Sequence, residues 1–464
     1  MTVPLVPALD PAAVVELAAE LLPRFRTERQ RLDRIDKYMR GQHAGPYTPK
    51  SASKEYKLLA ERARTNLLPL VVSGVAQALY VSNFQRSDGT PGRGWAHWQA
   101  NRMDARQTAI HRAALTYGTA YVLVLPGVDP LTKVSMPVIR GVSPRRMIAA
   151  WDDPADDDWP RYVLRVDPAP GGGWALRLYD ATHVYYLSAD RGDGITFVRA
   201  EWHGAGVCPV IAFRALPDLE GRVLGEVEPL IDSQDRLNQT IFDLLVSQSF
   251  GSFAIRYVTG MAPEVDADGK PRPLAVDARR LLMAADPDTR FGQLDGANLS
   301  PLLESADASM RHMAVISQTP ASDLLGQLAN LSAEALAAAR DGQTRKRTEY
   351  ETGFGENWEQ VLQLASAVAG DEEGARETAA EVRWRDMEAR SLSQIVDALG
   401  KAATMLGIPP EALWSRIPGV TQTEVNEWKA LRRDSDPLAA LADTLDRQAR
   451  PTGTAGAHDG GEAG

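Results

Sequence analysis

The sequence predicts an α+β fold that is predominantly α-helical, and three observations lead to this prediction. Apolar residues recur at helical spacing in long segments near the N-terminus and again in the middle of the chain. Between residues 119 and 204, segments rich in β-branched and aromatic residues alternate with Gly, Pro and Asp turns. The helical pattern then returns and includes one run of about 35 residues dominated by good helix formers.

The first predicted helix covers residues 11–40, with Asp10 as its cap and Pro11 at its first position. Its second half, RFRTERQRLDRIDKYMRG, is strongly basic, which indicates either a solvated helix face or a contact surface for an acidic partner. The segment GQHAGPYTPKSASKEY then has the composition of a loop. We expect a largely buried helix over 66–80 and another helix over 95–114.

Five segments predict an antiparallel sheet: TAYVLVLPG, VSMPVIRGVSP, RYVLRVDP, WALRLYDATHVYYLSA and GITFVRAEWHG. The acidic segment DDPADDD at 152–158 lies between the second and the third of them. Carboxylates bind a divalent cation when they recur at defined spacing, and neither EF-hand spacing nor a following Glu is present. We therefore interpret this segment as a solvated turn.

A helix, an insert and a second helix organise the middle of the chain. The first helix covers 225–250, and its polar face sets Arg236 alone against five acids: Glu226, Glu228, Asp232, Asp235 and Asp243. The insert over 251–298 is strand-like and rich in turns. The second helix starts at the cap Ser300, with proline at its first position.

The loop PASDLLGQLAN leads into the long helical run, which Ser332 caps and which would span about 50 Å. Helical patterns continue over 371–449, where Thr421 and Glu424 form a capping box. The tail from Pro451 onward has the composition of a disordered segment.

Composition excludes several classes of protein. The net charge is −10, and a protein that wraps nucleic acid is more often basic, so any role with DNA must avoid tight phosphate binding. The single cysteine, Cys208, excludes an internal disulfide and lies in an apolar run typical of a buried residue. The sequence shows no signal peptide and no apolar run of membrane-spanning length, which predicts an intracellular soluble chain.

No catalytic motif stands out. The sequence contains no phosphate-binding P-loop, no G-x-S-x-G elbow and no H-E-x-x-H zinc motif. The seven histidines are scattered, and we interpret His97 and His203, which lie among aromatic residues, as packed or surface side chains. The sequence therefore predicts neither an enzyme nor a bound cofactor or metal.

Local strings and their order provide the strongest signal. In chain order they are IDKYMRGQH, LLPLVVSGVAQALYVSNF, WQANRMD, ALTYGTAYVLV, VSPRRM, HGAGVCPVIAF, EVEPLIDSQDRLNQ and TPASDLLGQLANLSAEAL. Over about residues 25–435 this order resembles the portal (head–tail connector) proteins of tailed double-stranded DNA phages, of the siphovirus type. The last two strings are the most distinctive. The final one resembles the stretch in which the family's tunnel loop meets its long helix.

The resemblance implies a division into structural parts. These are a wing (1–224) of N-terminal helices and antiparallel sheet, a first stem helix (225–250), a small α/β clip (251–298), a second stem helix (299–319), a tunnel loop (320–332), a long wing helix (333–370), a helical crown (371–436), and a C-terminal helix with a disordered tail (437–464).

The resemblance also implies how the protein works. The family forms a ring, usually of twelve subunits, through which a terminase large subunit pumps double-stranded DNA that is later released through the tail. A head–tail adaptor and the major capsid and scaffolding proteins are further expected partners, with no membrane involved. The expected location is the portal vertex of the virion, after assembly in the host cytoplasm.

Three groups of residues are predicted to form the site. In the first stem helix, four acids are expected to face the channel partly, as a wall that repels DNA: Glu228, Asp232, Asp235 and Asp243. In the tunnel loop, a sequence short of charge is expected to adapt to the passing duplex: Leu324, Leu325, Gly326, Gln327, Leu328 and Asn330. In the clip, five basic residues are expected to contact DNA or acidic partners, or to form ordinary salt bridges: Lys270, Arg272, Arg279, Arg280 and Arg290.

Three other functions compete with this interpretation. Another head–tail connector or minor capsid protein is the nearest alternative, although adaptors are usually much smaller. A soluble enzyme with a helical lid would carry a cofactor or metal. A nucleic-acid-binding regulator conflicts with the pI of about 5.4 and with the missing helix-turn-helix or aromatic–basic platform.

Overall fold

A computed structural model of the chain describes residues 7–190, 194–251, 256–259, 288, 290–293, 298–326, 333–385, 392–414, 417, 420 and 422–435. The chain divides into two compact units, residues 1–385 and 386–464, and each is described by itself. Helices and antiparallel sheets are both present, as the α+β prediction requires. Among the described helices, none is long and apolar enough to cross a membrane.

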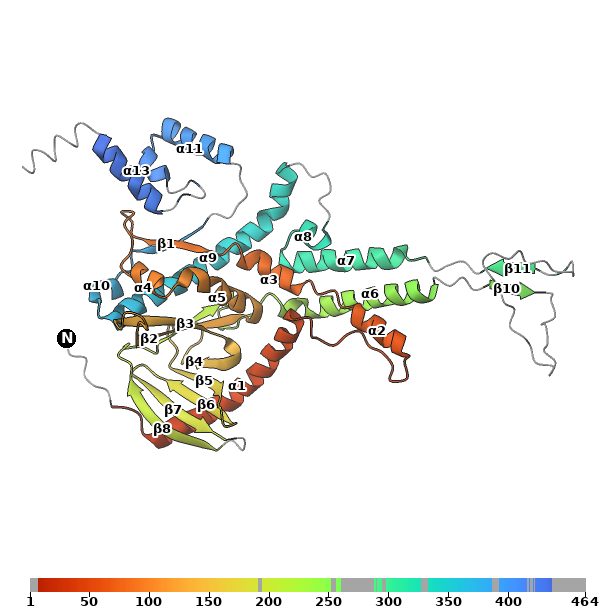
Figure 1. Cartoon of the computed structure of the whole chain (residues 1–464), viewed down its shortest axis with the longest axis horizontal. Helices are drawn as coiled ribbons and strands as arrows, with labels where there is room; N and C mark the ends of the chain where they lie inside the picture. The colour runs from red at the N-terminus through yellow and green to blue at the C-terminus, as the bar shows by residue number, and fades with distance from the viewer. Residues whose placement is uncertain are drawn as a thin grey trace, which may run out of the picture. The chain divides into compact units, whose positions relative to one another are not determined.

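Helix α1 (Pro11–Met39) confirms the first predicted helix. The Asp10 side chain accepts a hydrogen bond from the backbone N–H of Ala12 at 3.0 Å, and proline occupies the first helical position. In Figure 1 the helix runs beside the strands β4 to β8. Its N-terminal half buries an apolar stripe against that sheet, made of Val14, Ala18, Leu21, Leu22 and Phe25.

The predicted antiparallel sheet is in fact two sheets. The smaller has the order β3-β2-β9, with the strands β2 (Thr119–Val128), β3 (Ser135–Val142) and β9 (Val210–Arg214). The larger is a meander of five strands in chain order: β4 (Met147–Ala150), β5 (Tyr162–Pro168), β6 (Trp174–Tyr179), β7 (His183–Ala189) and β8 (Ile195–Trp202). The sheets are separate because β3 does not pair with β4, and because β9 pairs with β2 and not with its sequence neighbour β8.

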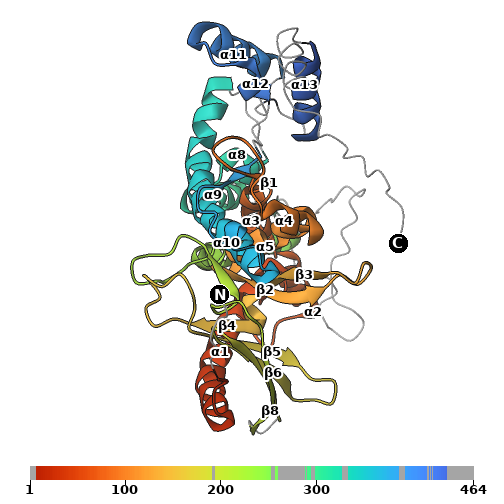
Figure 2. The same ribbon diagram turned by 90° about the vertical axis from the view of Figure 1, so that its left-hand side faces the viewer.

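The two sheets share a core that contains Cys208, a free thiol that is 2% exposed, as predicted. Burial in this core raises the pKa of the thiol. In Figures 1 and 2 the smaller sheet lies between the larger sheet and the layer of helices that includes α5 and α9. The acidic segment 152–158 forms an exposed turn between β4 and β5, which agrees with its interpretation as a solvated loop.

The helical layer differs from the prediction at two points. Instead of one helix over 95–114 there are two, and Arg102 breaks them apart with a left-handed φ of 53°. A short helix that the loop prediction missed begins at the Ser53 cap. The elements of this layer are α2 (Lys54–Arg62), α3 (Leu68–Ala76), β1 (Val81–Gln85), α4 (Trp95–Ala100) and α5 (Met103–Tyr117).

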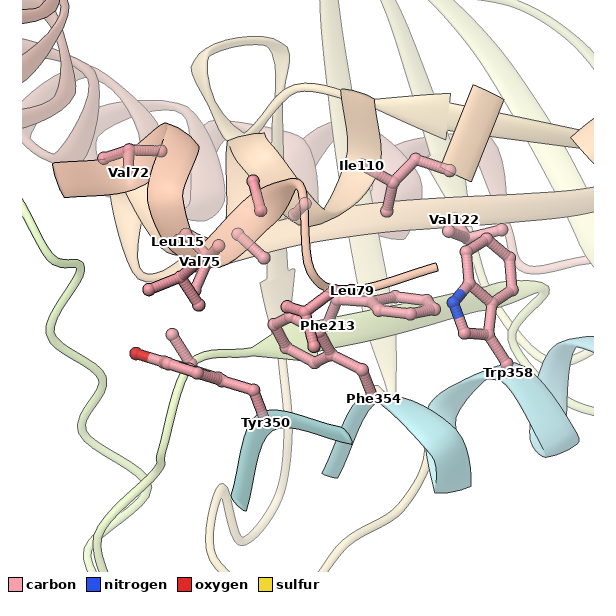
Figure 3. Close-up of a cluster of buried hydrophobic side chains, with 14 of the residues drawn as sticks. Val72, Val75, Leu79, Ile110, Leu115, Val122, Phe213, Tyr350, Phe354 and Trp358 are labelled. Carbon is pink, nitrogen blue, oxygen red and sulfur yellow. The ribbon is translucent and has the colours of Figure 1, made fainter. Parts of the chain in front are cut away.

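Helix α9 (Ala333–Ala369) is the predicted long helix, and it runs without interruption through Gly342, Gly353 and Gly355. Figure 3 shows side chains from one side of α9 pointing into the main core near Phe213. They are spaced four residues apart, about one turn, and are Tyr350, Phe354 and Trp358. This packing supplies the large buried surface that so long a helix requires.

After α9 the chain stays in the N-terminal unit as far as Arg385. After α10 (Glu372–Ala375) the strand β12 (Glu381–Trp384) pairs antiparallel with β1, where the sequence predicted only helix. The C-terminal unit consists of α11 (Leu392–Leu406), α12 (Pro410–Leu413) and α13 (Gln422–Ser435). Within it, the rings of Trp414 and Trp428 meet edge to face at 6.0 Å. Residues 437–464 and the predicted caps Ser332 and Thr421 lie outside the described residues.

Candidate channel wall and the joint behind it

A helix, a hairpin and a returning helix form the predicted stem and clip. The 3₁₀ turn η2 (Glu228–Leu230) leads into α6 (Ile231–Gly251), and α7 (Ser300–Ser317) returns. Between them β10 (Arg256–Thr259) pairs antiparallel with β11 (Arg290–Gln293). Figure 1 shows α6 and α7 side by side, and Arg236 near the start of α6 donates to Nδ1 of His312 near the end of α7 at 3.0 Å. The two helices are therefore antiparallel.

The start of α7 lies one residue from the prediction. Ser300 is the first helical residue and not the cap, and the Asn298 side chain accepts a hydrogen bond from the Ser300 backbone N–H at 3.1 Å. Pro301 therefore occupies the second helical position.

Buried polar side chains attach α6 to the N-terminal helices. The Gln234 amide accepts from the Leu67 N–H at 3.0 Å and donates to the Thr65 carbonyl at 2.6 Å. Asn238, one turn later, accepts from the Thr65 N–H at 3.0 Å and donates to Nε2 of His43 at 2.8 Å. Both amide side chains are almost fully buried. These hydrogen bonds were not predicted, although two amides four residues apart in an apolar stripe are a signal for buried polar contacts.

The acidic face of α6 is only partly free. Asp232, Asp235 and Asp243 are all exposed, and Asp232 and Asp243 are separated by about three helical turns, which puts them on one side of the helix. Asp235 accepts hydrogen bonds from the Tyr38 hydroxyl of α1 at 2.8 and 2.9 Å. Burial and this carboxylate raise the pKa of Tyr38 to about 12.

Glu228 likewise faces α1, where it pairs with Arg31. Other basic residues in α1 and at its C-cap are also paired within the chain: Arg29 with Asp33, and the cap residue Arg40 with Asp36. At these positions the basic residues form ion pairs within their own chain and stabilise its folded state. Of the four acids predicted to face a channel, Asp232 and Asp243 are the two whose side chains make no hydrogen bond or ion pair with another element in the described part of the chain.

Glu226, predicted on the same acidic face, is instead buried where the start of α6, the end of α7 and the long helix α9 meet, a region called the joint below. Its carboxylate pairs with the Lys346 ammonium of α9 and accepts a hydrogen bond from the Tyr350 hydroxyl at 2.6 Å. The same ammonium donates to the Ser317 carbonyl at the end of α7 at 2.8 Å. The Glu226 and Lys346 side chains are each 7% exposed. One buried ion pair thus ties the entrance of α6, the exit of α7 and the long helix together.

Gly225 lets the chain enter this joint. The Gly225 backbone passes so close to the end of α5 that a Cβ atom would lie 2.5 Å from the Thr116 carbonyl oxygen. Only glycine fits there without a shift of the backbone. The next residue, Glu226, donates its backbone N–H to the Leu115 carbonyl at 2.7 Å.

The predicted tunnel loop begins as a short helix, α8 (Ala321–Leu325). Leu324 is 6% exposed and belongs to the main core, so it anchors the loop and does not adapt to a passing duplex. Leu325 is half-buried, and Gly326 ends the helix with a left-handed φ of 64°. Gln327, Leu328 and Asn330 lie outside the described residues.

The clip is described only at its hairpin. Arg290 opens β11 and is exposed, whereas Lys270, Arg272, Arg279 and Arg280 lie outside the described residues. No group of three or more His, Cys, Asp or Glu side chains that could hold a metal ion occurs among the residues that the structure places. His203 is buried and bonded to the Asp180 carbonyl at 3.1 Å, as its packed interpretation required.

A model of the family described as "Phage portal protein, SPP1 Gp6-like" matches residues 19–438. The chain belongs to this family of phage portal proteins. The order of sequence strings therefore predicted the family correctly. Portal proteins of this family are structural proteins of the phage capsid, so the predicted capsid portal function is confirmed at the level of the family.

Individual relatives agree with this membership. The portal protein of Mycobacterium phage L5 is 25% identical over 350 residues, which cover 72% of this chain and 71% of the relative. The portal protein of Mycobacterium phage D29 is 24% identical over 348 residues, with the same coverage of both chains.

Solved structures with similar chains come from gene transfer agent particles. A chain in the virion of a native gene transfer agent particle has a TM-score of 0.45 and 13% identity, with 81% of this chain and 99% of that chain covered. A chain from the neck of the native particle, computed with C12 symmetry, has a TM-score of 0.40 and 14% identity, with 79% and 97% covered.

Proposed function

We propose that copies of this portal family member form a ring, of twelve subunits, and that α6 lines its central channel. Double-stranded DNA enters through the channel under the action of a terminase large subunit, is retained, and leaves through the tail by way of a head–tail adaptor. Assembly takes place in the host cytoplasm, on the major capsid and scaffolding proteins. The observation that carries the proposal is the antiparallel pair α6 and α7 with a β-hairpin between them.

Exposed apolar side chains on α7 support assembly into a ring. Val315 is 77% exposed, Leu303 53% and Ile316 52%. Val315 and Ile316 are neighbours, whereas Leu303 lies about three turns earlier, so α7 leaves apolar side chains near both of its ends available to a neighbouring subunit. Electron microscopy of the purified protein tests the proposal directly: we expect rings with a central hole, and a protein that stays monomeric at every concentration and salt condition would refute it.

Asp232 and Asp243 are proposed to repel the phosphate backbone. A channel that moves DNA must not bind it tightly, because each neutralised phosphate adds salt-dependent affinity. The double substitution Asp232→Lys and Asp243→Lys reverses the charge on this side of α6. We expect rings of the variant to bind a short DNA duplex at least about tenfold more tightly at low salt, with a steeper salt dependence. The measurement is a fluorescence-anisotropy titration at several salt concentrations.

A matched control makes the same change of charge elsewhere. Glu16 and Glu20 are exposed on α1 and lie one turn apart. Their double replacement by lysine changes the net charge equally but lies outside the proposed channel wall. Equal gains in DNA affinity for both variants would contradict a channel-lining role of α6.

The segment after Gly326 is proposed to contact the passing DNA. Leu324 is part of the core, so the test leaves it unchanged. In the test variant, the four residues from Gln327 to Asn330 are replaced by a Gly-Ser linker of equal length. We expect normal rings with a severe loss of packaged or retained DNA, measured by nuclease protection after packaging in vitro. The same replacement in the exposed turn Pro130–Lys133 should have no effect. Unchanged DNA retention in the loop variant would exclude this role.

A further inference from the structure

A row of cationic and aromatic side chains crosses one face of the five-stranded sheet. The strand register places Arg165 opposite Arg177, Arg177 opposite Tyr186, and Tyr186 opposite Arg199. The four side chains therefore lie in line across β5, β6, β7 and β8. Alternate residues of these strands pack against α1 on the other face, so the row lies on the face opposite α1. Part of this face packs against the smaller sheet through Val163, Tyr179 and Val184, and the Arg165 side chain is 16% exposed. The Arg177 side chain is 37% exposed and that of Arg199 is 56% exposed.

The chain neutralises this row only in part. Asp167 pairs with Arg146, accepts from Nε of Arg165 at 2.8 Å, and lies 3.7 Å from Arg177. One carboxylate is thus shared by three guanidinium groups. Like charges directly opposite each other destabilise a sheet, so this arrangement favours an additional anion.

At the end of the row, Arg199 pairs with Glu201 and stacks on the Tyr186 ring at 4.1 Å. Four guanidinium groups, with Arg146 included, therefore face two carboxylates and leave an excess of two positive charges. Arg177 lies over the same Tyr186 ring at 5.9 Å. The ring is occupied by guanidinium groups, which leaves it unsuited to stacking a nucleic-acid base.

The matching negative charge lies at the other edge of the same sheet. The turn 152–158 carries five aspartates and follows β4, which is one edge strand, whereas the row ends on β8, the opposite edge strand. Asp152 pairs with Arg161 at 2.8 Å, and the Asp153 and Asp157 carboxylates accept backbone hydrogen bonds within the turn. Asp156 is exposed and makes no hydrogen bond or ion pair with the described residues.

We infer that the acidic turn of one subunit docks on the arginine row of the next subunit. The inference rests on the proposed ring and names one of its contacts. Two different surfaces of one sheet, the row across its strands and the turn at its β4 edge, make a head-to-tail contact, which is the kind that closes into a ring. The partner is a second copy of this chain, because each copy carries both surfaces and the two surfaces have opposite charge.

Charge reversal on each surface, and then on both, tests the inference. Arg199→Glu and Asp156→Arg each place like charges at the contact. We expect each variant to raise the concentration needed for ring assembly at least about tenfold, as measured by sedimentation velocity at low salt. The double variant in one chain restores opposite charges between neighbours, so assembly should return to within about threefold of the wild type. Arg140→Glu, an equal charge change at an exposed position of β3, should assemble normally.

The outcomes separate this inference from the proposed function. Rings that form equally well with either single variant would overturn the inference and leave the proposed function intact. A double variant no better than the single ones would also overturn it, because the two positions would not meet. If Arg199→Glu assembles normally but loses binding to a short DNA duplex, the row binds nucleic acid instead. A wild-type chain that never forms rings would refute the proposed function and this contact together.

Discussion

Replacing Lys346 by Met is expected to lower the free energy of unfolding by about 3–5 kcal/mol. The Lys346 ammonium is buried against the Glu226 carboxylate, and its removal leaves that carboxylate in the core without a cation. The Ser317 carbonyl loses its hydrogen bond at the same time. Urea denaturation followed by circular dichroism measures the change. We also expect faster limited proteolysis in α6 and α7, because the joint holds the ends of both helices.

Two further variants show whether the buried ion pair causes this loss. Arg345 lies next to Lys346 on α9, but its pair with Asp341 is exposed, so Arg345→Met should cost at most about 1 kcal/mol. Glu226→Gln combined with Lys346→Met removes both charges and should recover a large part of the lost stability. If Lys346→Met were as mild as Arg345→Met, the joint would contribute little to stability.

The joint also shows which contacts local sequence patterns do not predict. Helical periodicity located α1, α6, α7 and α9 because each has a continuous apolar stripe that depends only on local spacing. Glu226 was assigned to the acidic outer face by the same reasoning, and it is buried. Its counter-charge, Lys346, lies 120 residues away, and no local pattern connects them. The buried amides Gln234 and Asn238 carry a local signal in their spacing of four residues, but that signal does not reveal their backbone partners at Thr65 and Leu67, which lie more than 160 residues earlier.

Strand pairing in the sheets likewise could not be predicted from local sequence. The strands β2, β3 and β5 to β8 each lie in a predicted β-rich segment, whereas the short strand β4 was not predicted. Pairing is a non-local property, and β9 pairs with β2 and not with β8. The strand β12 was missed because it depends on β1, about 300 residues earlier in the chain, and not on its own short sequence. Among the predicted site residues, Leu324 shows that a loop composition does not exclude a core position.

The last expected result concerns acid. Wild-type stability should fall as the pH drops below about 6.5, and His111 alone should contribute a loss of about 3 kcal/mol that is complete near pH 4. The imidazole is fully buried and neutral: Nδ1–H donates to the Leu79 carbonyl at 3.1 Å, and Nε2 accepts from the Trp358 indole N–H at 2.8 Å. Burial lowers the pKa of His111 to about 4. The unfolded chain takes up a proton near pH 6.5 and the folded chain does not, so acid favours unfolding.

His111→Phe isolates this contribution from that of other groups. The variant should be less stable at pH 8, because the Trp358 N–H and the Leu79 carbonyl each lose a partner at a cost of about 1–3 kcal/mol. Its stability should nevertheless fall less between pH 6.5 and 4 than that of the wild type, because the titrating group is gone. Val122→Ala, in the same core, should lose stability by a similar amount at every pH. The measurement is the free energy of unfolding from urea titrations at four pH values. Parallel pH profiles for the wild type and His111→Phe would show that His111 does not cause the loss of stability in acid.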